Sequence, residues 1–266
     1  MPYGLIHYNA PGDTVEEFID FAAEAGFESA EISSGDLWPA GESEPEKRAE
    51  ALRQYLADRG MVASALTSGN NFCTTDPADM DYQVERMGRV CRLAEILGTS
   101  ILRADGGWHR EDPRPGSAWV EAMVEGFSRS LEFAEPLGLR FALDNHGLVT
   151  NEWPVQLMVF EQVNSPVMGA NLDTMNYRWF GHSVEKLHEI YQAIAPYVIH
   201  THFKDGFDSR ENYRGTALGE GEIPLEWAVQ CLKQAHYAGD WTVEYEGPRD
   251  DGTGYRQGLA WLKAHT

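Results

Sequence analysis

Short β-like runs alternate with longer amphipathic segments along the whole chain. The runs with strand character predict strands at residues 3–7, 29–33, 62–67, 100–103, 139–144, 167–173, 198–204 and 241–246. Between them apolar residues recur at helical spacing, which predicts helices at residues 14–25, 46–58, 80–97, 118–137, 153–162, 184–194, 225–236 and 255–264. Each predicted strand is therefore followed by a predicted helix.

The connections between these elements are of two kinds. Five predicted helices end at a glycine, which readily takes the left-handed conformation that closes a helix, and a strand follows shortly afterwards. These glycines are Gly26, Gly60, Gly98, Gly138 and Gly239. Two other helices end near Pro166 and Pro196, because proline cannot continue a helix interior. Several connections from a strand to its helix are long instead, at residues 34–45, 104–117, 205–224 and 247–254.

Eight strand–helix units with short turns at one end and long loops at the other predict an α/β chain folded as a (β/α)8 TIM barrel. About 250 residues are typical of that fold. With 266 residues, the chain is expected to form a single domain over residues 1–266. A doubly wound open sheet is the alternative, but no predicted strand is followed by a GxGxxG turn.

Composition narrows the possible partners. The 42 acidic and 21 basic side chains give a net charge of −21, which argues against nucleic acids because that binding depends on Lys and Arg contacts to phosphates. No apolar run is long enough to span a bilayer, and the N-terminus lacks the basic and apolar stretches of a signal peptide. Since the three cysteines are widely spaced, we expect reduced thiols in a cytoplasmic protein that binds no membrane.

Polar side chains gather where the later strands end. Side chains alternate between the two faces of a strand, and this alternation places ionisable residues on the inward face of four consecutive strands. In a parallel barrel the active site forms at the carboxyl ends of the strands, so these side chains are expected to converge there. The converging residues are Asp144, Asp173, His202 and Glu244.

Three carboxylates and an imidazole this close together would repel one another unless a cation lay among them. A divalent metal ion keeps such carboxylates ionised, and mixed oxygen and nitrogen ligands suit Mn²⁺, Mg²⁺, Co²⁺ or Zn²⁺. We therefore expect one divalent metal ion held by Asp144, Asp173, His202 and Glu244. The other interpretation is that these residues are hydrogen-bonded polar groups at the mouth of the barrel.

Five short segments carry a resemblance to a known family. They are ALDNHG at residues 142–147, NLDTMN at 171–176, HTHFKD at 200–205, LGEGEI at 218–223 and VEYEG at 243–247. In this order they resemble the sugar phosphate isomerase/epimerase family of xylose-isomerase-like TIM barrels, which includes ketose epimerases of the D-tagatose 3-epimerase type. The resemblance extends over essentially the whole chain.

This resemblance implies metal ligands at the same four residues, and it implies that the ligands of the fifth and eighth strands, Asp144 and Glu244, also act as catalytic acid and base. One position departs from the family pattern. The family usually has Glu where Asp144 stands, and the loss of one methylene retracts the carboxylate by about 1.5 Å. The sequence therefore does not decide whether the Asp144 carboxylate reaches a substrate carbon.

A metal ion bound to the carbonyl and the neighbouring hydroxyl of a keto sugar acidifies the intervening C–H and stabilises an enediolate. Proton return then gives epimerisation or isomerisation, which is the predicted activity on a keto sugar or related polyol. Loss of a group from the next carbon would give a dehydratase or lyase on a keto sugar or keto-inositol instead. A non-catalytic barrel that binds a sugar or a partner protein is the second alternative. A DNA-repair endonuclease is disfavoured by the negative charge.

Other polar residues at the strand ends are candidates for holding the sugar. These predicted substrate-binding residues are His7, Glu31, Arg103, His146, Asn176, Lys204 and Glu246. Tryptophans in or near the long loops would shield a sugar ring from water, and they are Trp38, Trp108 and Trp179. The expected partner is a small-molecule sugar, and a homo-oligomer is the alternative to a single chain.

Overall fold

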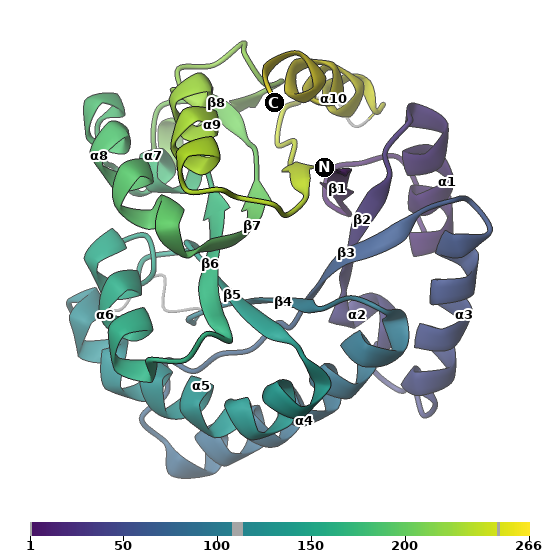
Figure 1. The fold of residues 1–266 in the computed structure, drawn as a ribbon, viewed down its shortest axis with the longest axis vertical. Helices are drawn as coiled ribbons and strands as arrows, with labels where there is room; N and C mark the ends of the chain where they lie inside the picture. The colour runs from purple at the N-terminus through teal and green to yellow at the C-terminus, as the bar shows by residue number, and fades with distance from the viewer. Residues whose placement is uncertain (1, 108–113, 249–250) are drawn as a thin grey trace.

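The computed structural model describes residues 2–107, 114–248 and 251–266. These residues form an α/β barrel in which helices surround a sheet of eight parallel strands, as the sequence predicts (Figure 1). In the sheet the strands follow the order β10-β1-β2-β3-β4-β5-β6-β7. Their bounds are β1 Tyr3–Ile6, β2 Ser29–Ser33, β3 Val62–Thr67, β4 Ile101–Ala104, β5 Arg140–Asp144, β6 Met168–Asp173, β7 Val198–His202 and β10 Trp241–Val243.

The sheet closes between β7 and β10 through Phe203, the residue directly after β7. Phe203 pairs in parallel with Val243. Its amide donates to the carbonyl of Thr242 at 2.7 Å, and its carbonyl accepts from the amide of Glu244 at 2.9 Å. The junction therefore lies immediately beside His202 and Glu244, so closure of the barrel itself brings these two residues together.

Eight helices follow the eight strands in the predicted places. Their bounds are α1 Val15–Ala25, α3 Pro45–Ala57, α4 Pro77–Leu97, α5 Val120–Ala134, α6 Trp153–Val163, α8 Val184–Ile194, α9 Leu225–Gln234 and α10 Thr253–His265. Helix α1 begins with a capping box, in which the Thr14 side chain accepts from the Glu17 amide and the Glu17 side chain accepts from the Thr14 amide. Its end at Gly26, with a φ of 88°, confirms the predicted glycine stop.

One predicted glycine stop is wrong. Helix α9 ends at Gln234 rather than near Gly239, and His236 takes the left-handed conformation with a φ of 58°. Histidine adopts this conformation more readily than most residues other than glycine, which explains why no glycine signal marks the helix end. The strands predicted to reach Lys204 and Glu246 also stop earlier, because the sheet ends at the Phe203 junction.

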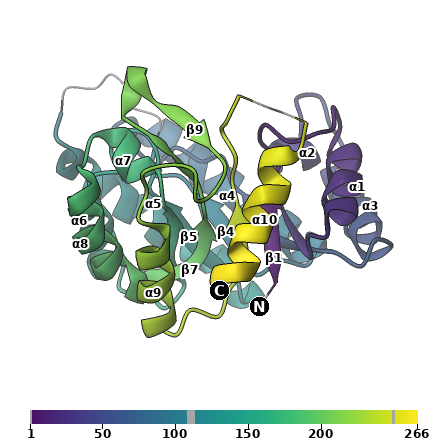
Figure 2. The same cartoon turned by 90° about the horizontal axis from the view of Figure 1, so that it is seen from above.

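The long loops contain regular structure that the sequence pattern does not predict. In the described residues, the connections from strand to helix hold two short helices, α2 Ser34–Leu37 and α7 Asn176–Phe180, two short 3₁₀ turns at Gly116–Trp119 and Arg210–Asn212, and a hairpin of β8 Asp205–Phe207 with β9 Arg214–Thr216. The hairpin lies at the end of the barrel opposite the two chain termini (Figure 2). Near those termini the Tyr3 hydroxyl lies 3.0 Å from the Thr266 side-chain oxygen.

Apolar side chains fill the layer between sheet and helices. Phe127 on α5 meets Phe72 at a ring distance of 4.9 Å and Phe141 on β5 at 5.7 Å. All three cysteines are buried. Among the described residues, no helix is both long and apolar enough to cross a bilayer. The buried apolar side chains form one continuous core, and most of the buried charged side chains lie at or near the carboxyl ends of the strands.

Candidate metal centre

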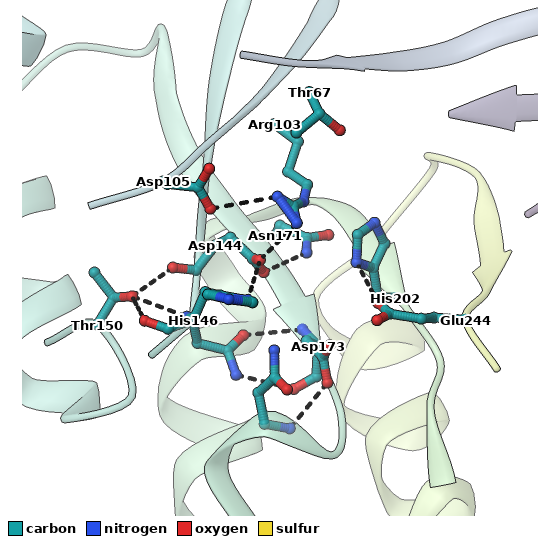
Figure 3. Close-up of polar contacts among 12 residues, drawn as sticks. Thr67, Arg103, Asp105, Asp144, His146, Thr150, Asn171, Asp173, His202 and Glu244 are labelled. Carbon is teal, nitrogen blue, oxygen red and sulfur yellow. Dashed lines mark hydrogen bonds and ion pairs between the residues drawn. The ribbon is translucent and has the colours of Figure 1, made fainter. Parts of the chain in front are cut away.

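The four predicted metal ligands lie where strand parity places them. Asp144, Asp173 and His202 are the last residues of β5, β6 and β7, and Glu244 directly follows β10. Their relative exposures are 1%, 0%, 0% and 8%, so only Glu244 has appreciable contact with solvent. Figure 3 shows all four side chains turned toward the space enclosed by the strands.

A register shift between β6 and β7 aligns two of these residues. Ala170 pairs with Val198, whereas the next residue, Asn171, pairs with His200. One residue of β7 is therefore skipped, and Asp173 pairs directly with His202. Without this irregularity Asp173 would lie opposite a side chain of the other parity, because side chains alternate with a period of two.

Asp173, His202 and Glu244 form a compact set of potential metal ligands, with one ligand atom from each lying within 4.8 Å of the others. Nδ1 of His202 lies 3.0 Å from Oε2 of Glu244. Two atoms of the set, Oδ2 of Asp173 and Nδ1 of His202, are buried without a hydrogen-bond partner in the described part of the chain, although each lies near a charged group. Two carboxylates and an imidazole with such unsatisfied atoms fit a divalent cation.

The carboxylate of Asp173 is oriented by its own strand end. Its Oδ1 accepts from the backbone amides of Met175 at 2.8 Å and Asn176 at 2.9 Å. The Asn145 side chain in turn bonds both the amide and the carbonyl of Asp173, at 2.9 and 3.0 Å. These contacts fix the carboxylate so that Oδ2 faces the other members of the set.

Lys204 supplies positive charge to the same place. Its Nζ lies 2.9 Å from Asp173 Oδ2, 3.0 Å from Glu244 Oε1 and 3.4 Å from Glu246 Oε1. Burial alone would raise the pKa of Glu244, but Lys204 and His202 hold it well below its ordinary value. Burial raises the pKa of Asp173, and Lys204 opposes that rise. Glu244 is therefore firmly ionised at neutral pH.

Asp144 lies apart from this set, with both carboxylate oxygens in other contacts. Oδ1 accepts from the Asn171 side chain at 2.6 Å, and Oδ2 lies 3.3 Å from the Arg103 guanidinium. His146 is also near, with Nδ1 at 3.8 Å from Oδ2, and burial lowers the pKa of His146 to about 4. In the described residues Asp144 is not a member of either group with ligand geometry. Its role as a metal ligand stays a prediction.

Arg103 on β4 joins Asp144 to two further carboxyl groups. Its Nε lies 3.4 Å from Glu31 Oε1, and its Nη1 lies 3.3 Å from Asp105 Oδ1. Burial raises the pKa of Asp105 to about 6, although Arg103 opposes the rise. Figure 3 shows Arg103 reaching from its strand toward Asp105 and Asp144. One buried guanidinium thus serves three carboxyl groups.

Glu31 on β2 connects His202 and His200 to the carboxylates around Arg103. Its Oε2 lies 2.7 Å from Nε2 of His202 and 2.8 Å from Nε2 of His200, and its Oε1 accepts from the Thr67 hydroxyl at 2.6 Å. Glu31, His200 and His202 also meet the geometric requirement for a metal site. His202 therefore lies between two carboxylates, Glu31 at one ring nitrogen and Glu244 at the other.

A pocket of about 490 Å³ opens directly beside the metal-ligand set. Three of the predicted substrate-binding residues line it, His146, Asn176 and Glu246, together with Trp179 and Tyr213. Because Glu246 contacts Lys204 and His146 lies near Asp144, the pocket borders the candidate metal centre. Pockets with a few convergent polar groups are typical ligand sites.

The other predicted substrate-binding residues do not line this pocket. Glu31, Arg103 and Lys204 belong to the buried network below the pocket, with exposures of 3%, 12% and 3% for their side chains. His7 stacks on Phe18 at a ring distance of 4.4 Å and faces Asp36 at 3.7 Å.

The three predicted sugar-shielding tryptophans have different environments. Trp179 lines the pocket. The Trp38 ring instead lies 4.3 Å from the Arg89 guanidinium carbon, away from the lining of the pocket. Trp108 lies outside the described residues. Trp179 is thus the tryptophan with a place beside a bound ligand.

Asp105, Thr67, Asn171 and His200 take part in the site without having been predicted for it. A signal existed for three of them, since Asp105 shares strand parity with Arg103, Asn171 with Asp173, and His200 with His202. Thr67 on β3 donates its hydroxyl to Glu31. Strand β3 contains no ionisable residue, so nothing in the sequence assigns Thr67 to the site.

A family model described as a xylose isomerase-like TIM barrel matches residues 19–265. Among solved structures, the IOLI protein with a binding zinc atom is 16% identical at a TM-score of 0.81, with 100% of this chain and 99% of that chain covered. A xylose isomerase domain protein from Planctomyces limnophilus is 20% identical at a TM-score of 0.75, with 99% and 95% covered. D-allulose 3-epimerase from Methylomonas sp. in complex with D-allulose is 20% identical at a TM-score of 0.77, with 100% and 97% covered. No curated protein matches the chain.

Proposed function

The chain belongs to the xylose isomerase-like TIM barrel family, and from that premise we propose that it is a divalent-metal-dependent isomerase or epimerase. Its substrate is a keto sugar or a related polyol, and the reaction passes through an enediolate. One observation carries the proposal: Asp173, His202 and Glu244 bring their ligand atoms within 4.8 Å of one another beside a pocket of about 490 Å³. The likeness to an allulose 3-epimerase and to a zinc-binding barrel supports it.

The metal ion is held by Asp173, His202 and Glu244, with Asp144 as the proposed fourth ligand. When bound, a divalent cation polarises the carbonyl of a keto sugar and makes the neighbouring C–H more acidic. Asp173 is held for this purpose by two backbone amides, which leave Oδ2 free of hydrogen bonds in the described part of the chain. His202 offers Nδ1, which is buried and points toward Oε2 of Glu244 at 3.0 Å.

Glu244 is the proposed catalytic base. It is the most exposed member of the set and remains ionised because Lys204 and His202 lower its pKa. A carboxylate of this kind removes the proton next to the carbonyl and returns it to the same or the neighbouring carbon. Lys204, at 3.0 Å from Glu244, neutralises part of the negative charge that accumulates during this step.

The possible reactions differ in whether they need a proton carrier on the face of the substrate opposite Glu244. Epimerisation needs a second proton carrier there, and Asp144 is the proposed one. Asn171 and Arg103 already occupy its oxygens, which favours reactions that need a single base. For this reason a dehydratase or lyase acting on a keto sugar or keto-inositol is the second candidate function.

The test is NMR in D₂O with a panel of keto sugars and keto-inositols, with the enzyme loaded with Mn²⁺ or Zn²⁺ and then treated with a chelator. The proposal predicts deuterium at the carbon next to the carbonyl, and loss of this exchange after metal removal. The deuterated carbon identifies the substrate and distinguishes isomerisation from elimination. Product without solvent deuterium would indicate hydride transfer between carbons, and no turnover of any compound would favour a binding protein.

A further inference from the structure

We infer that Glu31 is a positioning residue: it holds the ring of His202 so that Nδ1 is presented to the metal together with Asp173 and Glu244. This role is distinct from substrate binding, and it rests on the proposed function because it concerns one of the proposed ligands. Glu31 lies on β2, on the far side of His202 from Glu244, and its side chain is 3% exposed.

The contacts of Glu31 identify it as an acceptor. Nε2 of His202 and Nε2 of His200 both approach Oε2, at 2.7 and 2.8 Å. The Thr67 hydroxyl donates to Oε1 at 2.6 Å, and Nε of Arg103 lies 3.4 Å from the same oxygen. Donors surround both oxygens and the side chain is buried, so the Glu31 carboxylate is fixed in position. Nε2 of His202 therefore carries the hydrogen that this carboxylate accepts.

This hydrogen bond decides which ring nitrogen can bind a metal. An imidazole that binds a metal ion is neutral, with one N–H and one lone pair, so a proton kept on Nε2 leaves the lone pair for the metal on Nδ1. Nδ1 is the nitrogen that faces Oε2 of Glu244 at 3.0 Å, within the group that also contains Asp173. Metal-ligating histidines usually donate their second ring N–H to a carboxylate or carbonyl, which fixes the ring and strengthens the ligand.

A second metal ion among Glu31, His200 and His202 is the competing interpretation, since their ligand atoms also lie within 4.8 Å. The hydrogen bonding argues against it. Here both Nε2 atoms are already bonded to Glu31, whereas the other group contains Asp173 Oδ2, which has no hydrogen-bond partner in the described residues, and His202 Nδ1, which points toward Glu244. Of the two groups, the one with Asp173 is therefore the metal site, and Glu31 supports it.

The experiment compares the wild-type chain with Glu31→Gln, which keeps the shape of the side chain but removes one acceptor oxygen and the charge. Thr67→Val is the matched control, because it removes a contact to the other oxygen of the same carboxylate. Zinc content is measured by elemental analysis and zinc affinity by calorimetry, without substrate. Long-range ¹H–¹⁵N NMR of the zinc-loaded protein reads which nitrogen of His202 carries the hydrogen.

We expect one zinc ion per wild-type chain, with the hydrogen of His202 on Nε2. Glu31→Gln should bind zinc about 10- to 100-fold more weakly with the same stoichiometry, whereas Thr67→Val should keep nearly the wild-type affinity. Unchanged affinity in Glu31→Gln, or zinc on Nε2, would overturn the inference. Two zinc ions in the wild type and one in Glu31→Gln would make Glu31 a ligand instead.

These outcomes are separate from those of the proposed reaction. A chain that binds zinc as expected but exchanges no deuterium into any sugar would contradict the proposed activity and leave the role of Glu31 supported. A wild-type chain that binds no zinc would contradict both.

Discussion

The effect of burial on the charge of Asp105 can be tested by measuring the free energy of unfolding, without substrate or metal. It directly follows β4, is 2% exposed, and has Oδ2 buried without a hydrogen-bond partner in the described part of the chain. Burial raises its pKa to about 6 from an ordinary 3.8, against the opposing effect of Arg103. The folded chain therefore binds this proton more tightly than the unfolded chain.

The magnitude follows from the two pKa values. They differ by about two units, and each unit corresponds to about 1.4 kcal/mol, so ionised Asp105 costs the folded state about 3 kcal/mol. Between about pH 4 and pH 6 the folded chain holds more protons than the unfolded chain, and its stability falls as the pH rises. Above that range the full cost is present.

The perturbation is Asp105→Asn, which keeps the shape of the side chain and cannot ionise. The free energy of unfolding of both proteins is measured with urea from pH 4 to pH 8. The difference between them isolates this one group, and the variant should become more stable than the wild type by up to about 3 kcal/mol as the pH rises past 6.

Asp20→Asn is the control with the opposite sign. Asp20 is exposed, and the Arg59 hydrogen bond lowers its pKa, so that its contribution is lost toward low pH. A difference between wild type and Asp105→Asn that does not depend on pH, or one that favours the wild type at pH 8, would refute the assignment of Asp105 as a buried, destabilising carboxylate.

Three further predictions address the metal, the bases and the core. His202→Ala and Asp173→Ala should lose metal by elemental analysis while circular dichroism shows a retained fold, and normal metal content in both would exclude the proposed site. At saturating metal Glu244→Gln should abolish deuterium exchange while Asp144→Asn retains a measurable rate, and equal loss in both would make Asp144 a full catalytic partner. Phe127→Ala should lower the free energy of unfolding by about 3–5 kcal/mol in urea titrations, because Phe127 is fully buried between Phe72 and Phe141.

Much of the fold and part of the site follow from two simple periodicities. The helical spacing and the strand-like runs predict all eight strand–helix units, and strand parity places Asp144, Asp173, His202 and Glu244 at one end of the barrel. These features are local, since each depends on residues only a few positions apart. The glycine at the end of α1 is predictable for the same reason, because a left-handed helix end needs a particular residue type.

The remaining features depend on contacts between distant segments. The register shift at Asn171 is set by how β6 meets β7, and no local pattern marks it. The hairpin of β8 and β9 forms where the sequence has no apolar alternation, and Asp205 fixes it by accepting from the amides of Gly206, Gly219 and Gly221. The contact between Glu31 and His202 depends on the fold in the same way, since 171 positions separate the two residues.

The charge distribution explains why a metal fits this site although two cationic side chains are already present. Arg103 and Lys204 contact buried carboxyl groups from two directions, Arg103 on the side of β4 and Lys204 beyond β7. Five buried carboxyl groups surround them, and these belong to Glu31, Asp105, Asp144, Asp173 and Glu244. Burial would lower the pKa of His202, but Glu31 and Glu244 raise it to about 10, so three positive charges face five carboxyl groups. Burial makes the remaining repulsion costly. A divalent cation beside Asp173 and Glu244 would offset the excess where Arg103 does not reach. The shorter side chain of Asp144 belongs to the same balance, because its carboxylate pairs with Arg103, whereas Asp173, His202 and Glu244 are the described residues that group with ligand geometry on the side of Lys204.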